Sequence, residues 1–514
     1  MLFNSIEFCF FFPIVFILYF FCTHKICKNI ISQILLLSAS LFFYACWNPA
    51  YLALILISVI ITYLSGICME KYESKKKFIL TASLISNLAI LFFFKYYNFF
   101  ADSLHSVSKI FGAEIIIPNF NVLLPVGISF YTFQALGYSI DVYYKKINAE
   151  KNFITYALFV TFFPQLVAGP IERTKNLLEQ FKYDYKIDYD RITAGLKMCA
   201  WGYFKKVVVA DRLAVYVNGI YDNVSEATGC ALALATFFFA FQILCDFSGY
   251  SDIAIGISKI LGFNLMKNFN RPYFSKSIPE FWRRWHISLS TWFKDYLYIP
   301  MGGNRCGTVR RYFNLFTTFF VSGIWHGAAW HYIIWGALHG VYQIIGISTS
   351  KFRSKIGLKT KVLVEDASTK TGVRAKRPWQ YIQILITFVL TCYAWMFFRA
   401  NSFRSALKIT KKFIIIPKEL WEFLMNCRVN FKSSLRELFV PFLSKSGYGF
   451  SEVFAAFILI AILFSVDLIT RKTEGVILIK KQKWYIRWLL YYSITCAILF
   501  LGTSGKSEFI YFQF

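Results

Sequence analysis

The sequence predicts an all-α, polytopic membrane protein, and this fold class follows from its composition and from the spacing of its apolar runs. Of the 514 residues, 57% are hydrophobic and only 16% are charged, and the mean hydropathy is +0.49. A soluble domain of this length needs a polar surface and usually carries about a quarter charged residues. The chain has too few polar side chains for such a surface, so we expect apolar side chains to face lipid.

The apolar residues gather into runs that approach the length of a membrane-spanning helix, which is about 20 residues. These runs lie near residues 5–22, 30–48, 50–69, 79–100, 153–169, 230–262, 312–349, 380–398, 451–470 and 484–503. The runs 230–262 and 312–349 are each long enough for more than one element, and interrupted segments at 120–143 and 191–217 add candidates. We therefore predict roughly 10 to 13 membrane-embedded helices.

The basic residues indicate which loops face the cytoplasm. The chain has 56 Lys and Arg against 28 Asp and Glu, and the excess falls in short gaps between apolar runs, at 75–77, 145–146, 205–206, 310–311 and 480–481. This distribution is typical of cytoplasmic loops near anionic lipid, and it disfavours nucleic-acid binding. The loop 351–378, with nine Lys or Arg and two acids, is accordingly predicted to be cytoplasmic.

The N-terminal run is predicted to remain as a membrane anchor. Residues 1–7 lack the basic region of a signal peptide. The first basic residues, Lys25 and Lys28, come after the run, which places the N-terminus outside the cytoplasm by the positive-inside rule.

Two segments differ in kind from the apolar runs. Residues 164–190 and 266–311 mix Pro, Gly, Trp and charged residues at a density that a lipid-facing helix would not tolerate. We expect loops, re-entrant pieces or short helices that line an internal cavity.

The 12 cysteines are scattered along the chain without metal-ligand spacing, and no phosphate-binding loop, dinucleotide fingerprint or nucleophile elbow is present. The sequence therefore predicts no metal and no bound cofactor.

Histidines supply the main candidates for chemistry. There are six, of which His326 lies between Gly323 and Gly327 in an apolar run, and His286 lies in the segment 280–290. The small glycines would let another helix or a ligand approach closely. An imidazole in a membrane interior costs free energy unless it is paired or hydrated, and its near-neutral pKa suits acid–base work. From the residues alone, a histidine that merely hydrogen-bonds a neighbouring helix is an equal alternative. The other four are His24, His105, His331 and His339, of which we interpret the last two as structural.

Carboxylates and arginines near these histidines are the second group of candidates. Asp246 and Asp252 could orient an imidazole, pair with the arginines near 283 or carry protons, although a purely structural ion pair fits equally well. Their six-residue spacing puts them on different faces of a helix, so they do not form a catalytic dyad. Arg283 and Arg284 offer planar donors suited to phosphate, with a lipid-headgroup contact as the alternative.

At these residues the sequence resembles the membrane-bound O-acyltransferase family, and within it the branch of bacterial alginate O-acetyltransferases. The most specific segment is 280–305, because it carries a long series of matching residues. The resemblance extends through most of the chain in the family's order, at 1–5, 124–134, 163–173, 246–252, 280–305, 325–327 and 397–400.

The resemblance implies one family domain over 1–514, whose helices surround a central tunnel lined by re-entrant and short helices. It implies a core at about 120–400, a variable connection at 401–450 and C-terminal spans at 451–514. His326 matches the family's catalytic histidine, and His286 matches its second active-site histidine. We assign supporting roles to Asp246, Asp252, Trp325 and Ser322, and donor binding to Trp282, Arg283 and Arg284.

The activity that the resemblance implies is transfer of an acyl group, in the first instance acetyl, from a cytoplasmic thioester to hydroxyls of an exported polysaccharide. The donor would be acetyl-CoA or an acyl carrier protein, and the acceptor an alginate-like polymer, peptidoglycan or another surface glycan. A separate extracytoplasmic acyltransferase would complete the transfer, and the chain would lie in the cytoplasmic membrane of a bacterium. The alternatives are a flippase for a lipid-linked saccharide and D-alanyl transfer toward teichoic acid, whose proteins resemble this chain less around 164–173 and 296–305.

Overall fold

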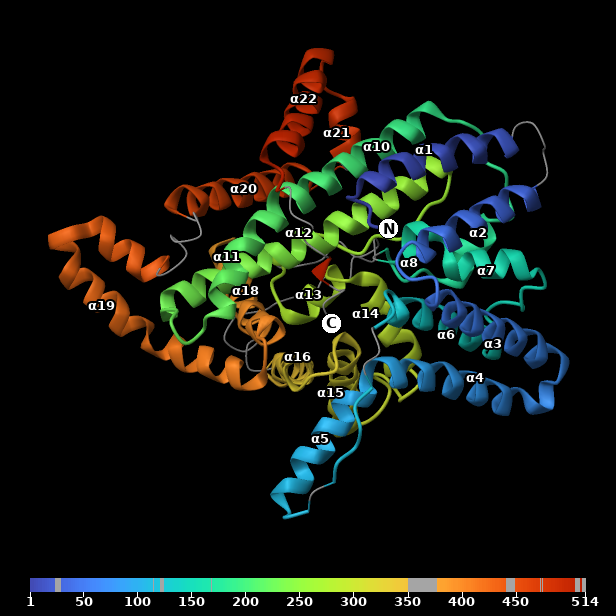
Figure 1. Cartoon of the computed structure of the whole chain (residues 1–514), viewed down its shortest axis with the longest axis horizontal. Coiled ribbons are helices and arrows are strands. Elements are labelled where there is room, and N and C mark those ends of the chain that lie inside the picture. The colour runs from blue at the N-terminus through green and yellow to red at the C-terminus, as the bar shows by residue number, and fades with distance from the viewer. Residues whose placement is uncertain are drawn as a thin grey trace. The chain divides into compact units, whose positions relative to one another are not determined.

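The fold is all-helical, as the sequence predicts. A computed structural model of the chain describes residues 1–23, 29–113, 115–120, 124–167, 169–349, 377–440, 449–471, 473, 475–503 and 509–510. Helices follow one another throughout these residues, and no strand occurs among them (Figure 1). The predicted basic loop at 351–378 lies outside the described residues apart from its last two positions, and His24 lies outside them as well.

The helices form two compact units. Unit 1 contains residues 1–203 and 249–267 with the C-terminal end, and unit 2 contains the described residues of 204–248 and 268–507. Helix α12, Gly229–Leu261, contributes to both units. The apolar run 230–262 therefore forms one 33-residue helix, although its length left room for two elements.

Unit 1 is a bundle of helices built from the N-terminal part of the chain. Within it α3 packs against α4 and α6, and α2 packs against α7 (Figure 1). The segment 164–190, which the sequence marked as unlike a lipid-facing span, contains most of the short helix α8 and all of the short helix α9. The elements are α1 Ile6–Phe21, α2 Asn29–Ala45, α3 Tyr51–Lys71, α4 Lys76–Leu91, the π-helical η3 Phe92–Tyr96, α5 Tyr97–Ile110, α6 Ile128–Tyr143, α7 Phe153–Thr161, α8 Phe163–Leu166, α9 Thr174–Gln180 and α10 Tyr189–Tyr203.

The start of α6 depends on a glycine. Gly127 precedes the helix with a φ of 73°, and a Cβ there would lie 2.7 Å from the carbonyl oxygen of Leu166. Gly112 has the same φ of 73°, yet a Cβ on it would meet no atom within 4 Å. Left-handed backbone costs an L-residue about 1–2 kcal/mol, and overpacking adds about 1–3 kcal/mol.

We expect Gly127→Ala to lower the thermal unfolding temperature of the detergent-solubilised protein clearly more than Gly112→Ala does. Both variants carry the same backbone strain, so the difference between them measures the contact with Leu166. Equal unfolding temperatures for the two variants would show that the protein accommodates a Cβ next to the Leu166 carbonyl without losing stability.

Unit 2 holds the rest of the fold. Helices α15 and α16 form a closely packed hairpin in it, and α16 also packs against α13 and α18 (Figure 1). The run 312–349 thus forms two helices, and 266–311 forms several short ones, as expected. The elements are the π-helical η4 Phe204–Ala210, α11 Asp211–Asp222, the first part of α12, η5 Pro272–Phe274, α13 Ile278–Arg284, α14 Ile287–Phe293, η6 Lys294–Tyr298, α15 Thr308–His326, α16 Trp330–Ser348, α18 Arg377–Arg399, α19 Phe403–Phe439, α20 Phe450–Ile469, α21 Gly475–Lys480 and α22 Trp484–Leu501.

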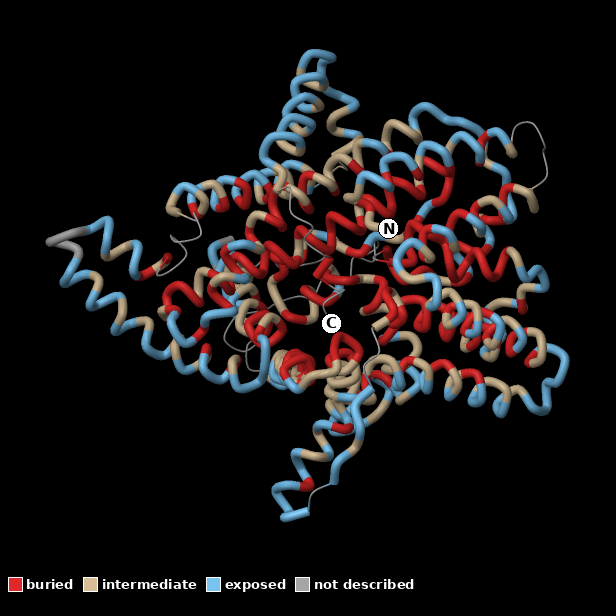
Figure 2. Tube along the Cα trace, in the orientation of Figure 1, coloured by how far each residue is buried: buried red, intermediate tan, exposed pale blue. Residues whose placement is uncertain are grey.

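Six helical segments of the described chain are long and apolar enough to cross a membrane, so the chain is a multi-pass membrane protein. The count is below the predicted 10 to 13 because several apolar runs form shorter helices: α1 has 16 residues and α2 has 17. Exposed apolar side chains suit contact with lipid, and Figure 2 shows α22 exposed along most of its length. The six segments are 51–71, 73–110, 229–261, 378–399, 450–469 and 484–501.

The segment 401–450, expected as a variable connection, is largely one helix. Helix α19 runs for 37 residues from Phe403 to Phe439. It begins at Ser402, whose hydroxyl accepts the backbone N–H of Ser405. Much of α19 is exposed (Figure 2), and it is not among the candidate spans of the described residues.

Candidate active site

The α15–α16 hairpin places His326 at the end of α15. Gly323 lies against α16 so closely that a Cβ on it would be 2.6 Å from the carbonyl oxygen of Tyr332 and 3.1 Å from the Cα of Gly336. The sequence predicted close approach of a helix or a ligand at Gly323, and the structure identifies α16 as the neighbour. Helix α15 then ends because Gly327 adopts an extended conformation.

His326 lies inside the protein rather than against lipid. Its side chain is only 3% exposed. Its ring lies 4.8 Å from the ring of Trp335 on α16 and 5.4 Å from that of Phe398 on α18, both in edge-on contacts. Three helices of unit 2 therefore enclose this imidazole, as an intramembrane histidine requires.

His286 occupies the junction between α13 and α14. It is fully buried, and its backbone is left-handed with a φ of 43°. Such a conformation is rare for a residue other than glycine and persists only where the surroundings hold it. Here Asn268 accepts the Ser288 hydroxyl at 2.6 Å and the Ile287 N–H at 2.9 Å, and the same hydroxyl lies 3.5 Å from Nδ1 of His286. Strained backbone at a buried histidine is a pattern that active sites favour.

The structure brings these two histidines together through one indole. The ring of Trp325 lies 4.9 Å from that of His326 and 6.1 Å from that of His286. Ser322 is buried one helical turn before His326. Three of the residues singled out in the sequence, His286, Trp325 and His326, thus meet in unit 2, although they come from two separate motifs.

Large aromatic side chains surround this cluster. Trp285, Trp335 and Trp395 are all at most 1% exposed. The ring of Trp395 lies 4.9 Å from Trp285 and 5.7 Å from Trp335. An apolar, water-excluding environment strengthens every electrostatic interaction with the histidines. Trp335 and Trp395 could not be selected from the sequence, because an aromatic side chain in an apolar run is usually part of a core.

The residues assigned to donor binding lie in different settings. Arg283 is exposed, and its Nε donates to the carbonyl of Pro279 at 3.3 Å. Arg284 forms an ion pair with Glu280 at 2.6 Å. Trp282 is buried, and its indole N–H donates to Nδ1 of the fully buried His339 at 3.2 Å. Of the three, Arg283 has the exposure that a phosphate ligand needs.

His339 and His331 both lie on α16. His339 is buried and accepts a hydrogen bond from Trp282, which fits the structural role expected for it. The ring of His331 lies 4.2 Å from that of Tyr332 at the start of the helix.

Asp246 pairs with a lysine of η4. Its Oδ1 lies 2.8 Å from Nζ of Lys206, and Lys206 lies equally close to Asp211. Of the alternatives left open by the sequence, the structure therefore contains the buried ion pair. Asp252 belongs to the unit 1 part of α12.

The interpretation of Lys205 and Lys206 as a solvated cytoplasmic loop is wrong. Both lie in the π-helical turn η4 and are buried, at 8% and 1% exposed. Lys205 donates to the hydroxyl of Ser248 at 2.8 Å. A basic pair between apolar runs is typical of a cytoplasmic loop, but carboxylates and a hydroxyl inside the protein supply the partners of this one.

Glu172, in the 163–173 motif of unit 1, is another buried acid. Burial raises the pKa of its carboxyl to about 7. Hydrogen bonds from the Met266 N–H and the Asn176 amide favour the ionised form and partly oppose this increase. The bond from Met266 connects the end of the motif to the segment that follows α12, and the bond from Asn176 connects it to α9.

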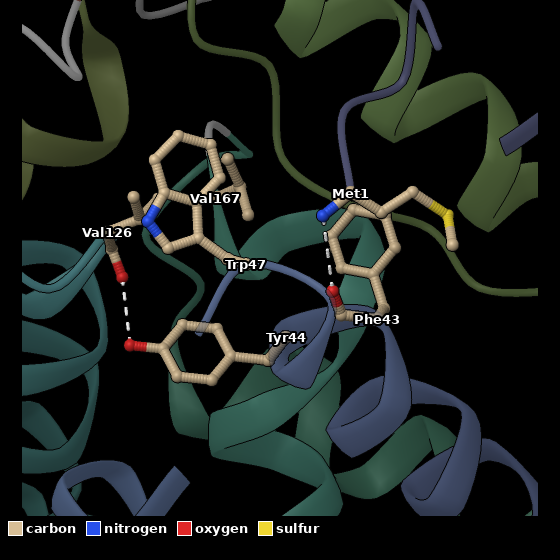
Figure 3. A pocket seen from close by; sticks show the side chains of 6 residues that line it. All are labelled: Met1, Phe43, Tyr44, Trp47, Val126 and Val167. Carbon is tan, nitrogen blue, oxygen red and sulfur yellow. Dashed lines mark hydrogen bonds between the residues drawn. The ribbon is translucent and has the colours of Figure 1, made fainter. Parts of the chain in front are cut away.

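Unit 1 also contains a small pocket beside the N-terminus. Figure 3 shows the amino group of Met1 near the carbonyl of Phe43, at 3.5 Å, and the Tyr44 hydroxyl donating to the carbonyl of Val126 at 3.1 Å. The lining residues are Met1, Phe43, Tyr44, Trp47, Val126 and Val167. None of these six side chains is an imidazole, a carboxylate or a cation, so the histidine cluster is the better candidate for acid–base chemistry.

Comparison with known proteins agrees with the resemblance read from the motifs. Residues 144–407 match the membrane-bound O-acyltransferase family. The chain is 40% identical to a probable alginate O-acetylase of Azotobacter vinelandii, over 72% of this chain and 70% of that protein. It is 32% identical to a peptidoglycan O-acetyltransferase of Helicobacter pylori, over 100% of this chain and 98% of that protein. A teichoic acid D-alanyltransferase of Bacillus subtilis is more distant, at 25% identity over 66% of this chain and 82% of that protein.

Proposed function

The chain belongs to the membrane-bound O-acyltransferase family, and from this premise we propose that it transfers acetyl groups from a thioester toward hydroxyls of an exported polysaccharide. The observation that carries the proposal is the pair of buried histidines, His286 and His326, in contact with the same indole of Trp325. An acyl transfer needs a base for the attacking hydroxyl and a group that positions the donor, and two neighbouring imidazoles can serve both needs.

In the proposed mechanism His326 is the general base. It accepts the proton of the acceptor hydroxyl while the hydroxyl oxygen attacks the thioester carbonyl carbon. The new C–O bond forms as the C–S bond breaks, and the proton passes to the departing thiolate. His286 positions the donor or polarises its carbonyl. A covalent acyl-histidine is the alternative, in which the imidazole itself attacks first.

The donor is proposed to be acetyl-CoA or an acyl carrier protein, and the chain's own side chains suffice for the proton transfers. Both donors carry phosphate, for which the exposed guanidinium of Arg283 is a suitable partner. Burial of the histidines among Trp285, Trp335 and Trp395 would protect a thioester from hydrolysis.

The acceptor is proposed as a class, a polysaccharide of the cell surface. The relatives' names refer to alginate and to peptidoglycan, and the peptidoglycan relative matches the whole chain. We propose that the protein lies in the cytoplasmic membrane of a bacterium and hands the acyl group to a separate extracytoplasmic transferase. The lower identity to a D-alanyltransferase makes D-alanyl transfer the weaker alternative.

Free thiol distinguishes this function from transport of a lipid-linked saccharide. The protein is reconstituted into vesicles with acetyl-CoA on one side, and with polysaccharide and the extracytoplasmic protein fraction that supplies the second transferase on the other. We expect thiol release to depend on the polysaccharide and to appear together with acetyl ester on it. A flippase would move a saccharide without releasing thiol, so saccharide transport with no thiol above the protein-free vesicles would reject the enzyme.

A further inference from the structure

Four charged side chains lie buried together in unit 2. Nζ of Lys206 lies 2.8 Å from Oδ1 of Asp211 and 2.8 Å from Oδ1 of Asp246, while Nζ of Lys205 donates to the Ser248 hydroxyl at 2.8 Å. None of the four is more than 8% exposed. We call Lys205, Lys206, Asp211 and Asp246 the buried charge cluster.

Stability alone does not account for such a cluster. The two lysines balance the two aspartates, which makes burial tolerable. Even so, well-packed apolar residues often stabilise a core as well as a buried ion pair does, because the ions lose their hydration. Ionisable groups inside a membrane protein are functional candidates for that reason. Both lysines also lie in a π-helical turn, η4, a local distortion that is frequent at functional sites.

The buried charge cluster holds the part of α12 that faces His286. Asp246 and Ser248 are its anchored residues, and they flank Phe247 on either side around the helix, since successive residues differ by about 100°. The ring of Phe247 meets the ring of His286 edge-on at 4.7 Å and an interplanar angle of 89°. It also meets Phe269 at 5.0 Å. One side chain thus connects the cluster to the histidine.

We propose that the buried charge cluster sets the position of His286 through Phe247. Lys206, Asp211 and Asp246 are then positioning residues for acyl transfer. The inference rests on the proposed role of His286. It explains how a histidine with a left-handed backbone conformation is held in position. The cluster fixes Phe247 on one side of the imidazole, and Asn268 with Ser288 fixes the backbone on the other.

Two substitutions test this connection by kinetics. Asp246→Asn removes a charge at nearly constant volume, and Phe247→Leu removes the ring. We expect each to lower kcat about 10–100-fold, because small displacements of a reacting group have effects of this size. The KM for the donor should change little. Since both variants act by the same route, the double variant should be no slower than the slower single one.

The control is an ion pair in the same unit. Glu452→Gln breaks the pair between Glu452 and Arg212, which are 2.7 Å apart, and Arg212 directly follows Asp211. This variant should keep the wild-type kcat. A general effect of losing a charge pair near η4 would lower the activity of the control as well.

A second measurement needs no enzymatic activity. Diethyl pyrocarbonate modifies accessible imidazoles, and mass spectrometry of the peptides reports each histidine. In Asp246→Asn and Phe247→Leu we expect His286 to react about 10-fold faster than in the wild type, as local opening exposes it. The buried His339 should stay slow in every variant, and the half-buried His105 should react faster than His339.

The two measurements separate this inference from the proposed function. Wild-type kcat and unchanged His286 labelling in both variants would overturn the inference while leaving the enzyme intact. If the wild type transfers no acyl group, the proposed function fails and the labelling alone decides the inference. Should Asp246→Asn fail to fold, Lys206→Met combined with Asp246→Asn removes one charge of each sign and takes its place.

Discussion

Replacing His326 with alanine is expected to lower acyl transfer about 10²–10⁴-fold, which is the usual contribution of a positioned general base. The imidazole is in edge-on contact with the apolar rings of Trp325, Trp335 and Phe398, none of which can accept a proton in its place. The measurement is the amount of acetyl ester on the exported polysaccharide, divided by the amount of protein in the membrane fraction. Loss of the ester at normal protein level supports the role of His326 as the base.

The control for this experiment is another histidine. His105→Ala removes a half-buried imidazole from α5, which belongs to unit 1, and should leave acetylation unchanged. Acetylation close to normal in His326→Ala, at a normal amount of protein, would remove His326 from the mechanism. The family membership of the chain would be unaffected by that result, but its proposed chemistry would need another base.

The sequence predicted the fold class because it depends on local signals, whereas His286 and His326 were selected through the family resemblance of their motifs and their catalytic roles stay a prediction. An apolar run of sufficient length predicts a membrane helix. The glycine at 323 predicts a close contact with another helix, whichever helix that is. The identity of that partner, α16, and the contact of His286 with Trp325 depend on packing between motifs about 40 residues apart in the chain.

The failures have a common physical cause, which is that a sequence does not say what surrounds a residue. Lys205 and Lys206 have the same local pattern as the exposed Lys145 and Lys146. Only the fold supplies Asp246 and Ser248 as their partners. Likewise Phe247 is one of 58 phenylalanines, and its contact with His286 becomes visible only when α12 is placed beside the α13–α14 junction.

Gly336→Ala, a change on α16, is expected to lower both the stability of the protein and its rate of acyl transfer. A Cβ at this position would lie 2.8 Å from the Cα of Gly323 and would also collide with the carbonyl oxygen of Phe319. Both obstacles are backbone atoms of α15, so no side chain can rotate away and the helices must separate. Overpacking of this kind costs about 1–3 kcal/mol or more. Because α15 carries His326, a shift of about 1 Å could also lower the rate about 10²-fold.

Thermal unfolding and thiol release per folded protein measure these two effects separately. Gly346→Ala is the matched control, since it makes the same change on the same helix, where a Cβ would meet nothing within 4 Å. Alanine is the better helix former by about 0.5–1 kcal/mol, so Gly346→Ala should unfold at the wild-type temperature or slightly above it, with normal activity. If Gly336→Ala behaves like Gly346→Ala in both assays, the close contact between α15 and α16 does not hold His326 in place. A lower unfolding temperature with full activity per folded protein would confine the role of the contact to stability. The joint loss of stability and rate is what we expect, because the same backbone contact packs the hairpin and locates the imidazole.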